Sequence, residues 1–263
     1  MSQAKPRIAV HKFASCDGCQ LALLNAGEAL VELAQLADIA HFAEGGWYAP
    51  GEPVDIALVE GSISAPEDAE RIRAVRASAR YLVTLGACAT AGGVQALRNG
   101  LARAADWLGE VYASPEFIRS LPDSLPVAAY VPVDLEIHGC PVSTEQVLEA
   151  VGDLLRGAVP APGADPVCTQ CKRRNLACVL VNGGQPCLGP VTRSGCGALC
   201  PAVGRACYGC YGPAGLVNAA ALARRFEALG LGGEDIAGRF LFITPAAEPF
   251  RSIGQGYRER GDG

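Results

Sequence analysis

The cysteines of this 263-residue chain fall into two spacing patterns, and they limit the fold more than any other feature. Four are spread through the first half, at Cys16, Cys19, Cys88 and Cys140. Eight crowd into one later stretch, at Cys168, Cys171, Cys178, Cys187, Cys196, Cys200, Cys207 and Cys210. Four thiolates hold one cubane iron–sulfur cluster. Twelve cysteines are three sets of four, so three [4Fe-4S] clusters are the candidate cofactors.

Composition narrows the class of protein. Half of the residues are hydrophobic, so the chain can bury a core without disulfides. The net charge of −5 argues against nucleic acid as a partner. The N-terminus shows no export signal, and no apolar run is long enough to span a membrane, so we expect a cytoplasmic protein without a membrane span. Disulfides rarely persist in the cytosol, so dense cysteine indicates metal or redox chemistry there.

Apolar runs alternate with helical patterns through the first half of the chain. Strands are predicted at 7–10, 54–59, 81–85 and 133–137, and helices at 20–36, 66–79 and 143–155. This alternation predicts an α/β fold, a parallel sheet with helices on both faces. The Pro/Gly-rich segment 159–166 predicts a boundary between domains 1–158 and 159–263. In the second domain we expect a helix at 215–230 and a mobile polar tail from 253.

The first four cysteines each follow a predicted strand closely. In an open parallel sheet, the loops at the carboxyl ends of the strands meet in one crevice. Three separate segments would thus bring four thiolates to one site. The alternative is that Cys88 and Cys140 are ordinary buried residues and that Cys16 and Cys19 form a thioredoxin-like redox pair.

Four segments together carry a resemblance to a known family. They are SCDGCQ (15–20), LVEGSIS (58–64), TLGACATAGG (84–93) and HGCPVSTEQ (138–146). They are similar, in this order, to motifs of the small, electron-transfer subunit of cytosolic nickel–iron hydrogenases, of the sulfhydrogenase delta type. The resemblance implies a flavodoxin-like domain with a proximal [4Fe-4S] cluster on Cys16, Cys19, Cys88 and Cys140. It also implies a separate large subunit that carries the nickel–iron centre.

Two further features bear on the resemblance. The related subunit of respiratory complex I is similar in its Gly-x-Cys and Cys-Pro elements, but its first ligands are adjacent cysteines, whereas this chain has Cys16 and Cys19 in a C-x-x-C pair. Glu60 matches an acidic position near the proximal cluster of the family. It is a candidate for cluster tuning or a proton path, and equally for a solvated or helix-capping carboxylate.

The eight later cysteines allow two interpretations. They suffice for two cubanes in a small ferredoxin-like domain, and the Cys200–Pro201 step is typical of bacterial ferredoxins. The same eight residues could instead form two structural zinc sites. The block's glycines and scarce regular structure predict a fold organised around metal rather than a hydrophobic core. The division of the eight stays open between a sequential split and an exchange of one ligand.

The resemblance predicts the function. We expect an electron-transfer subunit of a bidirectional nickel–iron hydrogenase that links the large subunit to flavin- and iron–sulfur-containing diaphorase-type subunits or another soluble carrier. It is an oxidoreductase only as part of its complex. A complex I-like subunit without hydrogen chemistry is the alternative. The basic run Lys172, Arg173 and Arg174 could dock an acidic electron carrier, although a solvated charge cluster is the commoner meaning of such a run.

Overall fold

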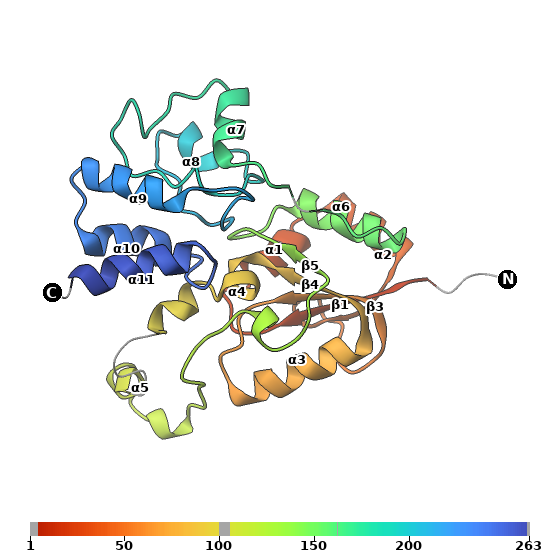
Figure 1. Cartoon of the computed structure of the whole chain (residues 1–263). Helices are drawn as coiled ribbons and strands as arrows, with labels where there is room; N and C mark the ends of the chain where they lie inside the picture. Colours follow the sequence, from red (N-terminus) through yellow and green to blue (C-terminus); the bar gives the residue numbers. More distant parts are fainter. Residues whose placement is uncertain (1–4, 100–105, 162, 262–263) are drawn as a thin grey trace.

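A single parallel sheet organises the first half of the protein (Figure 1). The computed structural model describes residues 5–99, 106–161 and 163–261. Across the sheet, the strands are β2 (Asp38–Phe42), β1 (Arg7–Lys12), β3 (Val54–Glu60), β4 (Ala79–Leu85) and β5 (Leu135–Ile137). The order 2-1-3-4-5 is that of flavodoxin-like sheets, in which ligands bind beyond the carboxyl ends of the strands. The predicted flavodoxin-like α/β fold is confirmed.

Helices cover both faces of the sheet because both faces are apolar. One face packs against α1 (Gly18–Leu24), α2 (Glu28–Leu36) and α6 (Thr144–Leu155), and the other against α3 (Pro66–Ser78). On the first face Leu58 lies in one core with Val147, and on the second face Ala57 lies in one core with Ile72. Such near-continuous apolar strands are typical of a parallel sheet covered on two sides.

Short elements connect the sheet to its loops. The helices α4 (Gly86–Ala91) and α5 (Asp106–Val111) follow β4. Single 3-10 turns lie at Ala43–Gly45, Val94–Arg98, Pro115–Phe117 and Val127–Ala129. Because α4 begins directly where β4 ends, it is held against the rim of the crevice.

Two helix predictions for the first half are accurate and one is wrong. α3 and α6 lie within one residue of the predicted spans, and the Ser143 hydroxyl accepts from the Gln146 backbone N–H, as its capping position predicts. The single helix predicted at 20–36 is two helices, α1 and α2, separated at Gly27. This glycine has φ 60°, a left-handed conformation that a continuing helix cannot include.

The last third of the chain is mostly helical after the cysteine block, and two short helices, α7 (Val167–Arg173) and α8 (Leu199–Ala202), lie within the block. The helices after the block are α9 (Ala219–Ala228), α10 (Gly233–Leu241) and α11 (Phe250–Gly261). Phe226, Phe240 and Phe250 are fully buried among α9, α10 and α11. These three helices therefore share a hydrophobic core, and the prediction that the cysteine block itself is organised around metal stays a prediction.

The predicted mobile tail is wrong, because α11 occupies most of it. Phe250 and Tyr257 are buried on one side of this helix. Gly254 lies on the same side, and a Cβ there would overlap the Leu241 side chain, so this glycine permits close packing of α11 on α10. The polar residues that suggested mobility lie on the outer side of the helix.

The predicted domain boundary stays a prediction, with one observation in its favour. The four buried clusters of the described residues each draw their members from one side of 158/159. The two parts nevertheless contact each other, since the Ala246 N–H donates to the Ala91 carbonyl over 3.1 Å. Within the described ranges, no helix has the length and apolar character that a bilayer span requires.

Candidate metal centres

The first four cysteines meet at the carboxyl end of the sheet, which we call the first site. Cys16 and Cys19 lie in the turn after β1 and in the first turn of α1, Cys88 lies in α4, and Cys140 follows β5. The Ala87 N–H donates to the Gly139 carbonyl over 2.7 Å, which joins the loop after β4 to the loop after β5. The structure thus brings together all four predicted residues, and their role as ligands stays a prediction.

Two glycines leave space beside the sulfur atoms of the first site. A Cβ atom at Gly86 would be 2.5 Å from the Cys19 Sγ, and one at Gly93 would be 2.6 Å from the Cys88 Sγ. Both glycines have positive φ, at 81° and 63°, which disfavours side chains there in any case. Four cysteine sulfurs with uncrowded approaches are the donor set of a [4Fe-4S] cluster, so the residues fit that group.

The raised pKa values of the thiols in the first site favour the binding of a positively charged metal centre. Burial and, after it, the neighbouring thiols of Cys140 and Cys16 raise the pKa of Cys88 to about 12, although a hydrogen bond from Gln95 acts to lower it. Burial also raises the pKa of Cys19, followed by the charge of Glu60. Thiols crowded in this way release their protons when a metal centre supplies positive charge.

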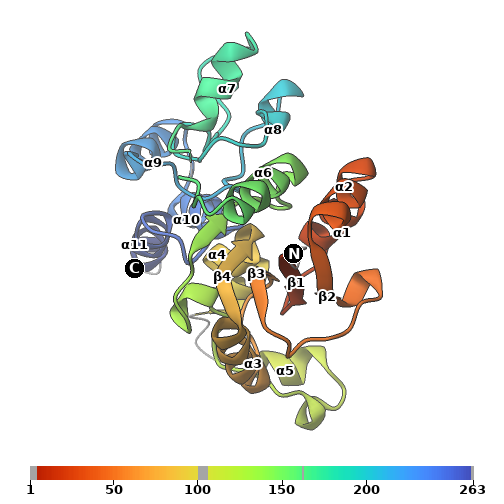
Figure 2. The same ribbon diagram turned by 90° about the vertical axis from the view of Figure 1, so that its right-hand side faces the viewer.

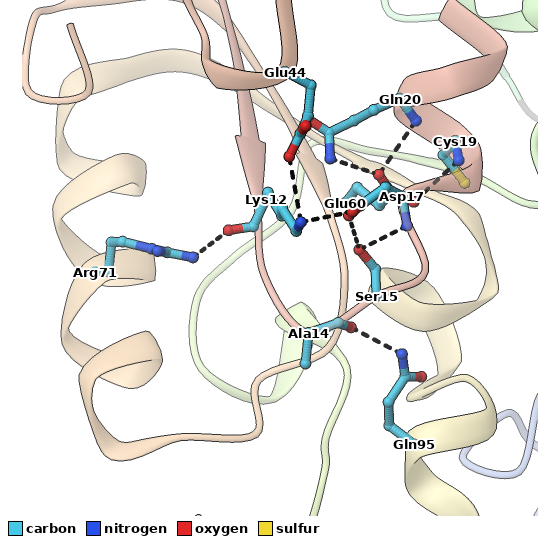
Figure 3. Close-up of polar contacts among 10 residues, drawn as sticks. All are labelled: Lys12, Ala14, Ser15, Asp17, Cys19, Gln20, Glu44, Glu60, Arg71 and Gln95. Atoms are coloured by element: carbon cyan, nitrogen blue, oxygen red, sulfur yellow. Dashed lines mark hydrogen bonds and ion pairs between the residues drawn. The ribbon is translucent and has the colours of Figure 1, made fainter. Parts of the chain in front are cut away.

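Glu60 holds α1 in place from the end of β3 (Figure 3). Its carboxylate, which is 2% exposed, accepts from the Cys19 N–H over 3.0 Å, from the Gln20 N–H over 3.2 Å and from the Gln20 side-chain amide over 2.9 Å. The cap residue of the helix, Asp17, makes no capping hydrogen bond with its side chain. Glu60 therefore serves as the helix-capping partner among the alternatives considered, and cluster tuning or a proton path stays a prediction.

The sequence analysis missed Gln20 and Gln95. The Gln95 side-chain amide donates to the Ala14 carbonyl over 3.1 Å (Figure 3). A hydrogen bond from Gln95 also acts to lower the pKa of Cys88, so Gln95 connects the turn after β1 to α4. Its Oε1 atom is buried and has no hydrogen-bond partner among the described residues. A polar residue within the otherwise apolar GGVQAL stretch was the only sequence signal for it.

The cysteines from 168 to 187 form a second group, which we call the outer site. Its members are Cys168, Cys171, Cys178 and Cys187. Burial and, after it, the thiols of the other three members raise the pKa of Cys168 to about 11. Gly189 lies between two members, since a Cβ there would be 3.3 Å from the Cys187 Sγ and 3.7 Å from the Cys168 Sγ.

The remaining cysteines, Cys196, Cys200, Cys207 and Cys210, line one side of a cavity of about 720 Å³, which we call the middle site. Cys140 of the first site lines the same cavity. Burial and, after it, the thiols of Cys196, Cys140 and Cys200 raise the pKa of Cys210 to about 12. The middle site therefore adjoins the first site.

Contacts also connect the middle site to the outer site. The Cys207 backbone N–H lies 3.2 Å from the Cys187 Sγ, to which it donates. Between the middle and first sites, Tyr211 is buried. Its pKa is raised by burial and then by thiols of both sites, including Cys210 and Cys140. The three groups therefore follow one another in the order first, middle and outer.

Exposure differs along this row of cysteines. The exposed ones are Cys16 and Cys140 of the first site and Cys178 of the outer site, and the other nine are buried or half-buried. No three Cys, His, Asp or Glu side chains in the described part of the chain are placed to bind one metal ion together. A cubane offers a separate iron to each thiolate, so its ligands need not converge on one ion.

Comparison with known proteins identifies the family. The family model of the 20 Kd subunit of NADH ubiquinone oxidoreductase matches residues 16–154, more than half of the chain. The sulfhydrogenase 2 subunit delta of Pyrococcus furiosus is 38% identical, over 79% of this chain and 86% of the relative. A crystal structure of an NAD+-reducing [NiFe]-hydrogenase in the H2-reduced state contains a similar chain. It is 34% identical, with TM-score 0.55, over 60% of this chain and 94% of that one.

The chain belongs to the small-subunit family of nickel–iron hydrogenases. The predicted resemblance is thereby confirmed, and so is the assignment to a class of oxidoreductase subunits. A subunit of the F420-non-reducing hydrogenase of Methanocaldococcus jannaschii is 28% identical, over 78% of this chain and 81% of the relative.

Proposed function

We propose that this hydrogenase small subunit relays electrons between a nickel–iron large subunit and NAD(P)-linked or other soluble-carrier subunits, in either direction. Each of the three sites would hold one [4Fe-4S] cluster through its four cysteines. Clusters of this type supply one-electron carriers with potentials set by charge, hydrogen bonds and exposure. The protein supplies the thiolates, the spacing and the order of the sites.

One observation carries the proposal, namely the row of cysteine groups with exposed members at its two ends. Cys16 opens the first site to a partner, and Cys178 opens the outer site, whereas the exposed Cys140 lines the cavity shared with the middle site. The middle site lies between the first and outer sites and shares its cavity with Cys140. Structural metal sites do not need to adjoin one another, whereas electron transfer across this chain requires its three four-cysteine groups to form an unbroken row between two exposed ends.

The partners follow from the two ends of the row. The large subunit would cover the first site, where Leu21 of α1 presents a 51% exposed side chain. The outer site would exchange electrons with flavin- and iron–sulfur-containing diaphorase-type subunits or with another soluble carrier that docks there. The likeness to a chain of an NAD+-reducing hydrogenase supports the diaphorase-type partner. A cytoplasmic location is part of the proposal, because all twelve cysteines are free.

Metal analysis of the full chain tests the cofactor proposal. Anaerobically purified protein should contain about twelve irons and about twelve inorganic sulfides per chain. Electron paramagnetic resonance after reduction should show interacting [4Fe-4S] signals. A colourless protein that holds zinc and lacks sulfide would overturn the proposal in favour of a zinc scaffold.

The complex I-like alternative has one observation in its favour, since the family model that matches residues 16–154 is that of the complex I subunit. The separation of Cys16 and Cys19 by two residues speaks against it. Isolation of the chain with its native partners decides between the two. A hydrogenase complex should contain nickel and take up hydrogen, whereas a complex with all three clusters but without nickel would favour the alternative.

A further inference from the structure

The segment that carries the outer and middle sites has an unusual charge. Residues 166–226 contain seven Lys or Arg residues and no Asp or Glu. Because the whole chain has a net charge of −5, the remaining residues carry −12. Such an asymmetry within one chain indicates a surface that attracts partners of opposite charge.

Part of this positive charge lies beside the outer site. Lys172, Arg173 and Arg174 are exposed at the end of α7, directly after Cys171. Backbone hydrogen bonds from the Leu176 N–H to the Cys171 carbonyl and from the Asn175 N–H to the Lys172 carbonyl turn the chain back towards Cys178. The α7 and α8 helices project at the same end of the molecule in both views, away from the sheet (Figures 1 and 2).

Next to the charges lies a depression with an apolar rim. Its volume is about 450 Å³, and its lining includes Cys178, Val179 and Pro201 but no acidic residue among those described. Val181 and Val203 flank it with side chains 74% and 73% exposed. The Gln185 side-chain amide donates to the Gly204 carbonyl over 3.0 Å and so holds the two loops of the depression together.

We propose that this surface, the exit face, docks an acidic iron–sulfur protein. The exit face consists of Lys172, Arg173, Val181 and Val203 around the exposed Cys178. A small apolar centre within a charged rim is suited to a transient redox partner, whose contact is small and whose approach is guided by charge. The inference rests on the proposed function, because only a cluster at the outer site gives the docked partner an electron to exchange.

Binding of an acidic plant-type [2Fe-2S] ferredoxin to the full, cluster-loaded chain tests the inference. The double variant Lys172→Glu/Arg173→Glu should weaken binding about tenfold at low salt and flatten the dependence of Kd on salt. Arg174 is left unchanged because its guanidinium donates to the Gly197 carbonyl. The matched control is Arg224→Glu/Arg225→Glu, an adjacent exposed pair on α9 in the same basic segment, and it should change Kd less than about threefold.

Equal weakening by both pairs, or by neither, would overturn the inference. A second measurement uses the unaltered chain, in case the first variant does not fold. It should bind the acidic ferredoxin more tightly than a basic cytochrome c of similar size, and the reverse preference would also overturn the docking site. Iron and sulfide analysis of each sample separates the two proposals. A chain without clusters contradicts the proposed function, whereas a loaded chain without the charge preference contradicts only the exit face.

Discussion

At the scale of single residues, Glu60 combines a structural and an electrostatic role. Its carboxylate accepts three hydrogen bonds from α1, and its charge raises the pKa of Cys19 after the larger effect of burial. In Glu60→Gln the charge is lost, so the midpoint potential of a cluster at the first site should rise by an amount on the order of tens of millivolts. One donor would also lose its acceptor, which costs about 1–3 kcal/mol of stability.

A redox titration followed by electron paramagnetic resonance measures this shift. The control is Glu44→Gln, because Glu44 is an exposed carboxylate whose contact is with Lys12. Its removal should leave the potential almost unchanged, since solvent screens exposed charges. If the two variants shift the potential equally, Glu60 has no special influence on the first site.

His11 predicts a pH dependence that does not involve the cysteines. It is 4% exposed, its ring centroid lies 4.8 Å from that of His41, and its pKa is lowered to about 4 by burial and then by the charges of His41 and Arg71. Below about pH 6.5, the ordinary pKa of histidine, this residue is protonated in the unfolded chain but not in the folded chain. The free energy of unfolding therefore falls as the pH drops from about 6.5 towards 4. Between pH 7.5 and 5.5 the loss from this residue should be about 1 kcal/mol.

Thermal melts of the cluster-loaded protein across this pH range provide the measurement. In His11→Gln, the decline of Tm towards pH 5.5 should be shallower than in the unaltered protein, because the proton-binding difference is removed. An unchanged slope would show that His11 does not contribute to acid sensitivity.

At the scale of elements, two glycines of α11 should respond to the same substitution in opposite ways. A Cβ at Gly254 would overlap the Leu241 side chain, whereas a Cβ at Gly256 meets no heavy atom within 4 Å. Gly254→Ala should therefore force α10 and α11 apart and cost about 1–3 kcal/mol. Gly256→Ala should add up to about 1 kcal/mol through helix propensity. Circular dichroism melts that show the same sign for both variants would contradict the packing role of Gly254.

Elements with local signals could be predicted from the sequence. The Pro66 start of α3 and the Ser143 cap of α6 are short-range features, and both helices occur where expected. The strand ends also placed the first site, because parallel sheets put all carboxyl ends at one edge. The break at Gly27 and the packing glycine Gly254 could not be told from flexible glycines, since their meaning depends on long-range neighbours.

The division of the eight later cysteines was unpredictable for the same reason. Spacing along the chain allowed either a sequential split or an exchange, and nothing local distinguishes them. The contacts that favour the sequential split come from distant residues, such as the approach of Gly189 to the sulfurs of Cys168 and Cys187. The Cys207 N–H bond to Cys187 crosses between the two groups, so even the folded chain keeps them in close association.

At the scale of the whole molecule, the proposed order of the sites predicts which step of electron transfer is blocked when one cysteine is replaced. Cys210 belongs to the middle site beside Cys140, whereas Cys168 belongs to the outer site. In a hydrogenase assembled with Cys210→Ala, hydrogen should still reduce the first site, but reduction of an acceptor at the exit face should fall more than about tenfold because the intervening carrier is lost. With Cys168→Ala, hydrogen should still reduce both the first and middle sites.

Freeze-quenched electron paramagnetic resonance under hydrogen, compared with steady-state acceptor reduction, distinguishes the two variants. The order depends on Cys140, which lines the cavity of the middle site and is exposed at the first. If Cys168→Ala instead left the middle site oxidised under hydrogen, electrons would have to enter at the outer site, and the large subunit would belong at the exit face. The charge of the segment 166–226 argues for the first arrangement, because its exposed Lys172 and Arg173 lie at the exit face and the segment has no acidic residue, which suits a charged, exchangeable partner.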